Sequence, residues 1–196
     1  MVHAKEISRN TKSRLIGGLI LLAFILYGGG TALALSGQKI FGVSLILTNS
    51  VVVIMIGVLV KSILEKDSPF SAKVYFFTRL SEALLLGVGA IALIFGSDGE
   101  ELNTTLYRLA MIILGLGSIV FCRWLITTRV IYVSLAWLGY IGYPLMALSM
   151  IAEFLGGENL AIILIIPGAV FELILGVLLL IVGLRSPISS NQSVNH

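Results

Sequence analysis

The stretch LAIILIIPGAVFELILGVLLLIVGL, residues 160–184, decides the fold class of this chain. A helix needs about 20 apolar residues to cross a hydrocarbon core about 30 Å thick, and this stretch is long enough to do so. The only charged side chain in it belongs to Glu172. The stretch therefore predicts a membrane-spanning helix that carries one carboxyl group inside the bilayer.

Further apolar runs precede this stretch, at residues 15–35, 40–60, 74–95, 105–122 and 130–154. Hydrophobic residues make up 58% of the 196 residues and charged residues only 12%, which is too little charge to cover the surface of a soluble domain. The alternating pattern of a membrane β-barrel is absent. We therefore predict an all-α integral membrane protein, built as a bundle of six transmembrane helices.

Basic residues mark one side of the predicted bundle. Cytoplasmic connections of membrane proteins are enriched in Lys and Arg, so their distribution predicts orientation. One set of connections and chain ends holds Lys5, Arg9, Lys12, Arg14, Lys61, Lys66, Lys73, Arg123, Arg129 and Arg185. The opposite set holds Lys39 together with Asp98, Glu100, Glu101, Glu153 and Glu158. We expect cytoplasmic N- and C-termini in a multi-pass protein of the cell membrane.

The chain divides into a basic cytoplasmic segment at 1–14, a six-helix transmembrane domain at 15–184 and a polar tail at 185–196 that we expect to be disordered. The small residues Ala32 and Ala34 after the first apolar run also fit a signal-peptide cleavage site. The run is longer than the apolar part of a usual signal peptide, which favours a retained helix. Cleavage is the alternative.

Several classes of function lack the residues they need. The histidines are His3 and His196, both at the chain ends, and Cys122 is the single cysteine. We therefore predict no metal site, no haem or other cofactor, and no enzyme, because no catalytic motif is present either. The basic residues lie at helix ends rather than on one face, so we expect no nucleic-acid partner. The expected partners are the lipid bilayer and either a second copy of the chain or another membrane protein.

Four charged residues lie within the predicted spans: Arg79, Glu82, Arg108 and Glu172. A charge in hydrocarbon costs at least about 2.5–3.5 kcal/mol, so such residues usually face the bundle interior with a partner. Arg108 is only about one turn from the end of its span and can extend to the headgroups. Arg79 and Glu82 are three residues apart, which places them on one helix face.

Glu172 lies about 18 Å from the predicted cytoplasmic end at 1.5 Å per residue, so its short side chain cannot reach either membrane surface. It can carry a proton, or it can pair with a neighbouring helix. Arg79 is the best charged partner by depth, and Asn49, at the centre of the second span, is the best neutral one. We expect Glu172, Arg79, Glu82 and Asn49 to lie together, with Arg108 as a further candidate.

Proline and small residues complete the pattern. Pro144 lies inside the fifth span, where it removes a backbone hydrogen bond and predicts a kink that brings the Tyr140 and Tyr143 hydroxyls into the bundle. The stretches YGGG (27–30), GVGA (87–90) and GLGS (115–118) carry small residues that allow close helix approach. A flexible gate is the alternative interpretation of these small residues.

Three stretches resemble a bacterial membrane family described as domain of unknown function 4386. They are FFTRLSEALLLG (76–87), LAWLGYIGYPL (135–145) and IPGAVFELILGVLLLIVGL (166–184). The sharpest marks are Arg-x-x-Glu in the first stretch and Pro-Gly-x-x-x-Glu in the last. Members often have Pro-Arg ahead of the fifth span, and this chain lacks that proline. The resemblance extends over most of the chain and implies a multi-span helical protein of the cell membrane, with no activity to carry over.

Two hypotheses about function follow from the polar residues in the spans. In the first, the protein has a structural, regulatory or partner-binding role, and its Arg, Glu and Asn side chains form a buried network that fixes helix register. In the second, it is a small transporter or an ion- or proton-conducting protein that uses Glu172 in a cavity at the membrane midplane. The first predicts that Glu172 is fully bonded and that no cavity exists. The second predicts a cavity that reaches Glu172 and Asn49.

Overall fold

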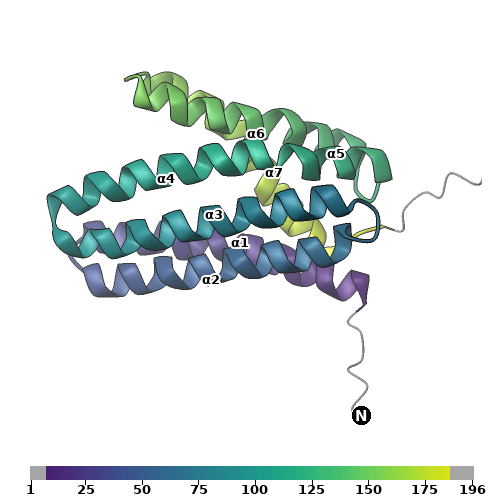
Figure 1. Cartoon of the computed structure of the whole chain (residues 1–196), viewed down its shortest axis with the longest axis horizontal. Helices are drawn as coiled ribbons and strands as arrows, with labels where there is room; N and C mark the ends of the chain where they lie inside the picture. Colours follow the sequence, from purple (N-terminus) through teal and green to yellow (C-terminus); the bar gives the residue numbers. More distant parts are fainter. Residues whose placement is uncertain (1–7, 186–196) are drawn as a thin grey trace, which may run out of the picture.

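The computed structural model describes residues 8–185 of the chain, and these form a bundle of long helices (Figure 1). Successive long helices run antiparallel, joined by short turns. In chain order the elements are α1 (Arg9–Leu35), α2 (Lys39–Leu64), α3 (Pro69–Ala92), η1 (Leu93–Phe95), α4 (Ser97–Gly117), α5 (Ile119–Thr128), α6 (Val133–Phe154) and α7 (Glu158–Ile181).

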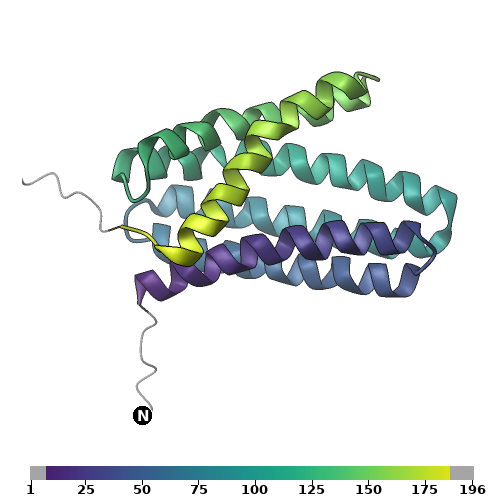
Figure 2. The same cartoon turned by 180° about the vertical axis from the view of Figure 1, so that it is seen from behind.

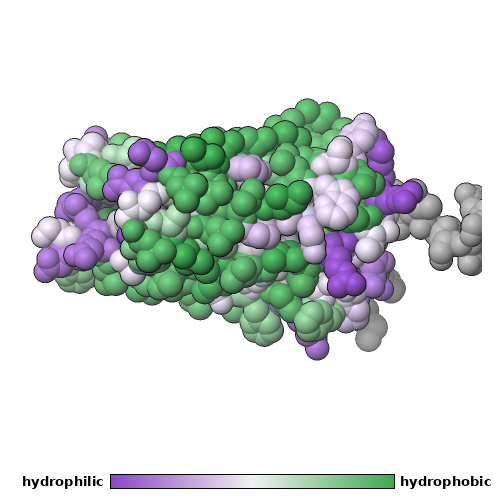
Figure 3. All heavy atoms as spheres, turned by 90° about the horizontal axis from the view of Figure 1, so that it is seen from above, coloured by the Kyte–Doolittle hydropathy of each residue, from purple (hydrophilic) through white to green (hydrophobic). Residues whose placement is uncertain are grey.

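Six helical segments are long and apolar enough to cross a membrane, because α3 continues into η1 and α4 with α5 makes one span. This confirms the prediction of an all-α fold with six helices of membrane-spanning length and hydropathy. Figure 3 shows the corresponding surface, with apolar side chains over the middle of the molecule and polar ones gathered toward the two ends. The backbone N–H of Leu184 donates to Ser13 Oγ at 3.1 Å, so the first and last spans meet at one end of the bundle.

We call that end the basic end, because α1 begins there, α2 and α7 end there, and most Lys and Arg residues lie beside it. The other end, where α4 and α7 begin, is the acidic end. Which end faces the cytoplasm stays a prediction from charge. The predictions made for residues 1–7 and for the tail beyond Arg185 lie outside the described residues.

The first four spans are longer than the apolar runs that predict them, whereas α6 and α7 are slightly shorter than theirs. Residues 61–73 are expected to form the longest connection, yet α2 continues to Leu64 and α3 begins at Pro69. Charged residues can extend a helix beyond the hydrocarbon, where water and headgroups solvate them. Pro69 suits the first position of a helix, where its missing N–H has no intrahelical partner.

The fourth span is interrupted, although the sequence predicts one helix at 105–122. The break falls at Ser118, after Gly115 and Gly117, which have low helix propensity. These glycines also bring α4 close to its neighbours. A Cβ atom on Gly117 would overlap the Thr78 side chain of α3, and one on Gly115 would crowd the Ala147 Cβ of α6 at 2.9 Å.

Helix α7 lies obliquely across the bundle and crosses α1 near the basic end (Figure 2). Gly17 and Gly176 make the crossing close, because a Cβ atom on Gly17 would overlap the backbone of Gly176 and Leu180. Toward the acidic end, α7 packs against α6 and diverges from α1. This divergence leaves the middle of α1 without α7 beside it.

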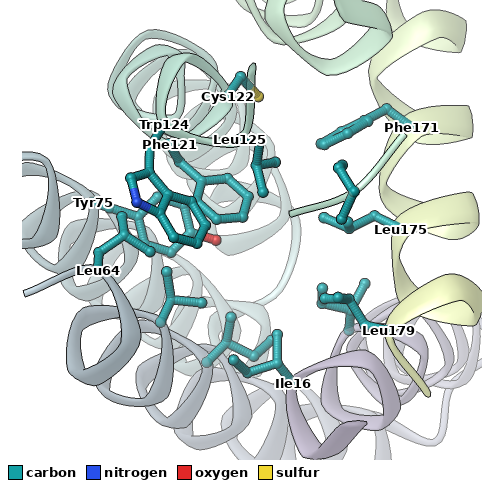
Figure 4. Close-up of a cluster of buried hydrophobic side chains, with 14 of the residues drawn as sticks. Ile16, Leu64, Tyr75, Phe121, Cys122, Trp124, Leu125, Phe171, Leu175 and Leu179 are labelled. Carbon is teal, nitrogen blue, oxygen red and sulfur yellow. The ribbon is translucent and has the colours of Figure 1, made fainter. Parts of the chain in front are cut away.

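A large apolar core fills the bundle toward the basic end (Figure 4). Its aromatic centre joins α3 to α5, since the Tyr75 and Phe121 ring centroids are 4.8 Å apart and those of Phe121 and Trp124 are 6.2 Å apart. We call this cluster the apolar core. Its labelled members are Ile16, Leu64, Tyr75, Phe121, Cys122, Trp124, Leu125, Phe171, Leu175 and Leu179.

Candidate functional site

Arg79 is the centre of the buried polar cluster, with only 4% of its surface exposed. Its guanidinium group donates three hydrogen bonds, each from a different nitrogen. Nε donates to the Tyr75 hydroxyl at 2.9 Å, Nη1 to Glu82 Oε2 at 2.9 Å and Nη2 to Glu172 Oε1 at 3.1 Å. Tyr75 and Glu82 lie four residues before and three residues after Arg79, so α3 places all three side chains on one face.

Glu172 links this face of α3 to two other helices. It lies roughly 21 Å along α7 from the first residue of that helix, which is near the middle of the span. Its Oε1 atom accepts a second hydrogen bond, from the Tyr143 hydroxyl of α6 at 2.7 Å. No hydrogen bond reaches Oε2 from any residue that the structure describes. The side chain is 15% exposed, compared with 5% for Glu82.

The cluster has one more carboxylate than guanidinium. Arg79 supplies the positive charge, and Glu82 and Glu172 supply the carboxylates. If both acids were ionised, one negative charge would stay unbalanced at mid-span, where a bare charge is costly. One bound proton or one bound cation makes the cluster neutral.

A cavity of about 200 Å³ opens beside this cluster. Glu172, Glu82 and Arg79 line one part of its wall, and Asn49 of α2 lines another. Asn49 is 2% exposed, and its Oδ1 atom has no hydrogen-bond partner among the described residues. A buried carbonyl without a partner costs about 1–3 kcal/mol, so a donor brought into the cavity would be bound favourably there. The apolar lining consists of Ile20, Ala23, Phe24, Tyr27, Gly28, Val53, Ile56, Leu86, Tyr107, Met111 and Leu114.

The cavity reaches the outer surface of the bundle along α1. Phe24 is 37% exposed and Gly28 is also exposed, although both residues line the cavity. The stacked rings of Tyr27 and Tyr107, 5.2 Å apart, connect α1 to α4 here. A Cβ atom on Gly28 would meet nothing within 4 Å, and neither would one on Gly29. Close packing therefore does not explain these two glycines, whereas Gly30 does lie against Gly42 and Ile46 of α2.

The structure brings Glu172, Arg79 and Glu82 into direct contact and places Asn49 in the wall of the same cavity. Asn49 donates no hydrogen bond to Glu172, so it is a neighbour of the cluster rather than a partner of this acid. Arg108 lies elsewhere: its Nη2 donates to Glu153 Oε1 at 2.7 Å, and its guanidinium lies over the Phe154 ring. This pair joins α4 to α6 toward the acidic end and does not line the cavity.

Pro144 lies within α6, which is continuous from Val133 to Phe154, so the kink stays a prediction. Of the two tyrosines beside it, Tyr143 reaches Glu172, whereas the Tyr140 ring packs edge-on against Trp137.

Sequence reasoning does not find Tyr75, Tyr27 or Tyr107. The spacing of Tyr75 four residues before Arg79 is a signal that was available, since such a pair shares a helix face. Nothing in the sequence pairs Tyr27 with Tyr107, because their stacking depends on how α1 and α4 are placed. Within residues 8–185, no three His, Cys, Asp or Glu side chains gather where they could hold a metal ion.

The family described as domain of unknown function 4386 matches residues 100–183, a range from α4 to the end of α7. This confirms the resemblance over that part of the chain. The matched range contains Pro167, Gly168 and Glu172 but not Arg79 or Glu82. No curated protein and no solved structure matches the chain.

Proposed function

We propose that the protein is a small membrane transporter that carries protons, with Glu172 as the group that binds them at mid-span. The observation that supports this most directly is the cavity that reaches both Glu172 and Asn49. The excess of one carboxylate over guanidinium supports it further, because the cluster needs one exchangeable positive charge to be neutral.

Glu172 is better suited than Glu82 to exchange a proton. Its side chain is the more exposed of the two, at 15% against 5%. Arg79 and Tyr143 both donate to Oε1 and hold the carboxyl group in place, which leaves Oε2 to bind the proton. The carboxyl group then works from a fixed position, and only the proton moves.

The second candidate is a structural or regulatory role, in which the cluster fixes helix register. Its support is the set of hydrogen bonds that ties α3, α6 and α7 together through Arg79, Glu172 and Tyr143. Under this alternative the cavity is a packing defect, and the activity of the protein depends on a partner.

We also propose that the basic end is cytoplasmic and that the protein resides in the cell membrane. The support is the gathering of Lys and Arg at that end, with Lys39 as the basic residue of the connections at the acidic end. A cysteine introduced at Ser36, in the turn between α1 and α2, should react with a membrane-impermeant reagent from outside intact cells. Labelling only after the cells are broken would reverse the assignment.

Proton movement can be measured in vesicles that contain the purified protein and a pH-sensitive dye. A potassium gradient with valinomycin imposes a membrane potential, negative inside. We expect faster acidification than in protein-free vesicles, and we expect Glu172→Gln to lower the rate to that background. Glu153→Gln is the matched control, because it removes the acid of another partly buried ion pair, away from the cavity.

The outcomes separate the two candidates. Wild-type vesicles no faster than protein-free ones, or Glu172→Gln vesicles as fast as wild type, would refute proton transport. If Glu172→Gln does not assemble, Asn49→Leu gives the test, because Asn49 lines the cavity but has no hydrogen bond to the cluster. An assembled Asn49→Leu protein with wild-type flux would favour the structural role.

A further inference from the structure

We infer that the cavity binds a lipophilic organic cation, a protonated amine with a compact apolar body, which enters from the bilayer beside α1. This inference names the ligand class of the site and rests on the proposed function. Four features of the cavity support it: its depth in the membrane, its charge, the aromatic side chains at its opening, and the unpartnered oxygen of Asn49.

The opening lies at the depth of the acyl chains. Phe24 is roughly 22 Å from the first residue of α1 and roughly 17 Å from the last, at 1.5 Å per residue. A hydrocarbon core about 30 Å thick therefore covers it on both sides. A molecule that enters between Phe24, Gly28 and the Tyr27–Tyr107 stack comes from lipid rather than from water, so it must dissolve in the bilayer.

The charge of the cluster selects a cation. Arg79 donates from Nε, Nη1 and Nη2 to protein oxygens, so its guanidinium is already engaged and is not an open anion site. When Glu82 and Glu172 are both ionised, Arg79 balances only one of the two carboxylates. A bound anion would add a further negative charge, and a neutral molecule would leave the excess carboxylate unbalanced. A protonated amine removes the imbalance when the proton on the carboxyl pair leaves to water. The amine and the proton then compete for one negative charge.

Several titratable groups lie close enough to influence the exchange of the proton for the amine. They come from every helix around the polar cluster and the cavity except α2. They are Tyr27 of α1, Tyr75, Arg79 and Glu82 of α3, Tyr107 of α4, Cys122 of α5, Tyr143 of α6 and Glu172 of α7. The two carboxyl groups are the acids among them that ionise most readily in water. Proton release on binding is therefore expected from Glu82 and Glu172.

Aromatic rings and an amide favour a protonated amine over other cations. Phe24, Tyr27 and Tyr107 lie at the opening, and the negative face of an aromatic ring attracts a cation. The Oδ1 atom of Asn49 can accept a hydrogen bond from an ammonium N–H, which a quaternary ammonium lacks. The volume of about 200 Å³ suits a ligand with a single aromatic ring.

The test uses three probes of similar shape and different charge: 2-phenylethylamine, 3-phenylpropanol and 3-phenylpropionate. Binding to the protein in lipid nanodiscs is measured calorimetrically, with empty nanodiscs as the reference for partition into lipid. We expect saturable binding of the amine, with about one proton released per amine bound. We expect Glu172→Gln to weaken it by about tenfold or more, which corresponds to 1.4 kcal/mol. Asn49→Leu should weaken binding of the amine more than binding of its N,N,N-trimethyl analogue, because the analogue has no N–H to donate to Asn49.

Gly28→Trp tests entry from the bilayer, and Gly29→Trp is its matched control. A side chain at either position has open space around its Cβ atom, but only Gly28 lines the cavity. We expect Gly28→Trp to slow amine association by about tenfold or more and Gly29→Trp to leave it unchanged. Equal rates in both variants would overturn lateral entry beside Gly28.

The results distinguish this inference from the proposed function. Proton flux that depends on Glu172, with no specific amine binding, would refute the ligand class and leave proton transport standing. Saturable amine binding that Glu172→Gln weakens, without proton flux, would support the ligand class and refute transport. Binding of the propionate or the propanol as tight as that of the amine would overturn the charge argument.

Discussion

The apolar core and the cavity share α1, α2, α3, α4 and α7, and they differ in how completely side chains fill the space. Toward the basic end, α5 inserts Phe121, Trp124 and Leu125 among residues of α1, α2, α3 and α7 (Figure 4). At mid-span α7 has diverged from α1 (Figure 2), and side chains of α4 line the cavity without filling it. Charged and amide groups line the space left there.

This difference indicates which region of the bundle adds to the free energy of unfolding and which region lowers it. Close packing is the main force that holds helices together in a lipid environment, so the apolar core should carry most of the stability. The cavity contains a carboxyl pair and an unpartnered amide oxygen, which cost stability. Such a cost is typical of a functional site.

Phe121→Ala should give the largest effect. Removal of a buried phenylalanine ring costs about 3–5 kcal/mol, because the space left behind does not close completely. Phe121 is 5% exposed and packs on Tyr75 and Trp124, whereas Phe24 lines the cavity and is 37% exposed. Phe24→Ala should therefore change the free energy of unfolding by about 0.5 kcal/mol. Reversible unfolding in mixed detergent micelles measures the free energy of unfolding of both variants. Equal losses in the two variants would contradict the proposed difference in packing between the apolar core and the cavity.

Arg79→Met should lower the free energy of unfolding by about 3 kcal/mol, because it leaves two buried carboxyl groups without their cation. Adding Glu82→Gln and Glu172→Gln to this variant should recover at least half of the loss, since the buried charges are then gone. The same unfolding measurement reports both. If the triple variant were as unstable as the single one, hydrogen-bond geometry rather than charge would hold the cluster together.

Asn49→Leu should stabilise the protein by about 1 kcal/mol, because it removes a buried oxygen that has no hydrogen-bond partner. The same variant should lose proton flux, so stability and activity move in opposite directions at this position. A clear loss of stability would show that Asn49 serves the packing of α2 instead.

Arg108→Met should have the smallest effect, about 0.2–1 kcal/mol. Arg108 and Glu153 form a short ion pair, but their side chains are 23% and 28% exposed, so the surroundings solvate both charges when the pair is broken. Proton flux should stay at the wild-type level. A loss above about 3 kcal/mol, in the range of Arg79→Met, would mean that depth in the bundle does not set the strength of these pairs.

The six spans could be predicted from the sequence because their signal is local. Apolar length defines each span, and the loop-by-loop distribution of Lys and Arg supports the count. The break at Ser118 could not be predicted in the same way, since it lies beside the close approach of Gly117 to Thr78 on another helix. The pairing of Arg79 with Glu172 follows from depth alone, because few charges lie at that level of the membrane.

For the cavity, the sequence offers only two alternatives, one with a cavity at Glu172 and Asn49 and one without, and it does not decide between them. The cavity lies where α7 runs obliquely away from α1, and no residue spacing encodes that angle. The same holds for the Tyr27–Tyr107 stack, which joins helices that are distant in the sequence. For Asn49, the sequence indicates its depth but not its missing hydrogen bond.

The glycine crossing of α1 and α7 also has a mechanical consequence. The two helices touch backbone to backbone at Gly17 and Gly176, which makes that point a fulcrum with the rest of α7 as its lever arm. The first residue of α7 lies roughly 27 Å from the fulcrum, so a rotation of about 5° would swing it by roughly 2 Å. Glu172, only about 6 Å from the fulcrum, would move by roughly 0.5 Å. The end of α7 that packs against α6 can thus shift while the Glu172 carboxyl group, the contribution of α7 to the cavity wall, stays nearly still.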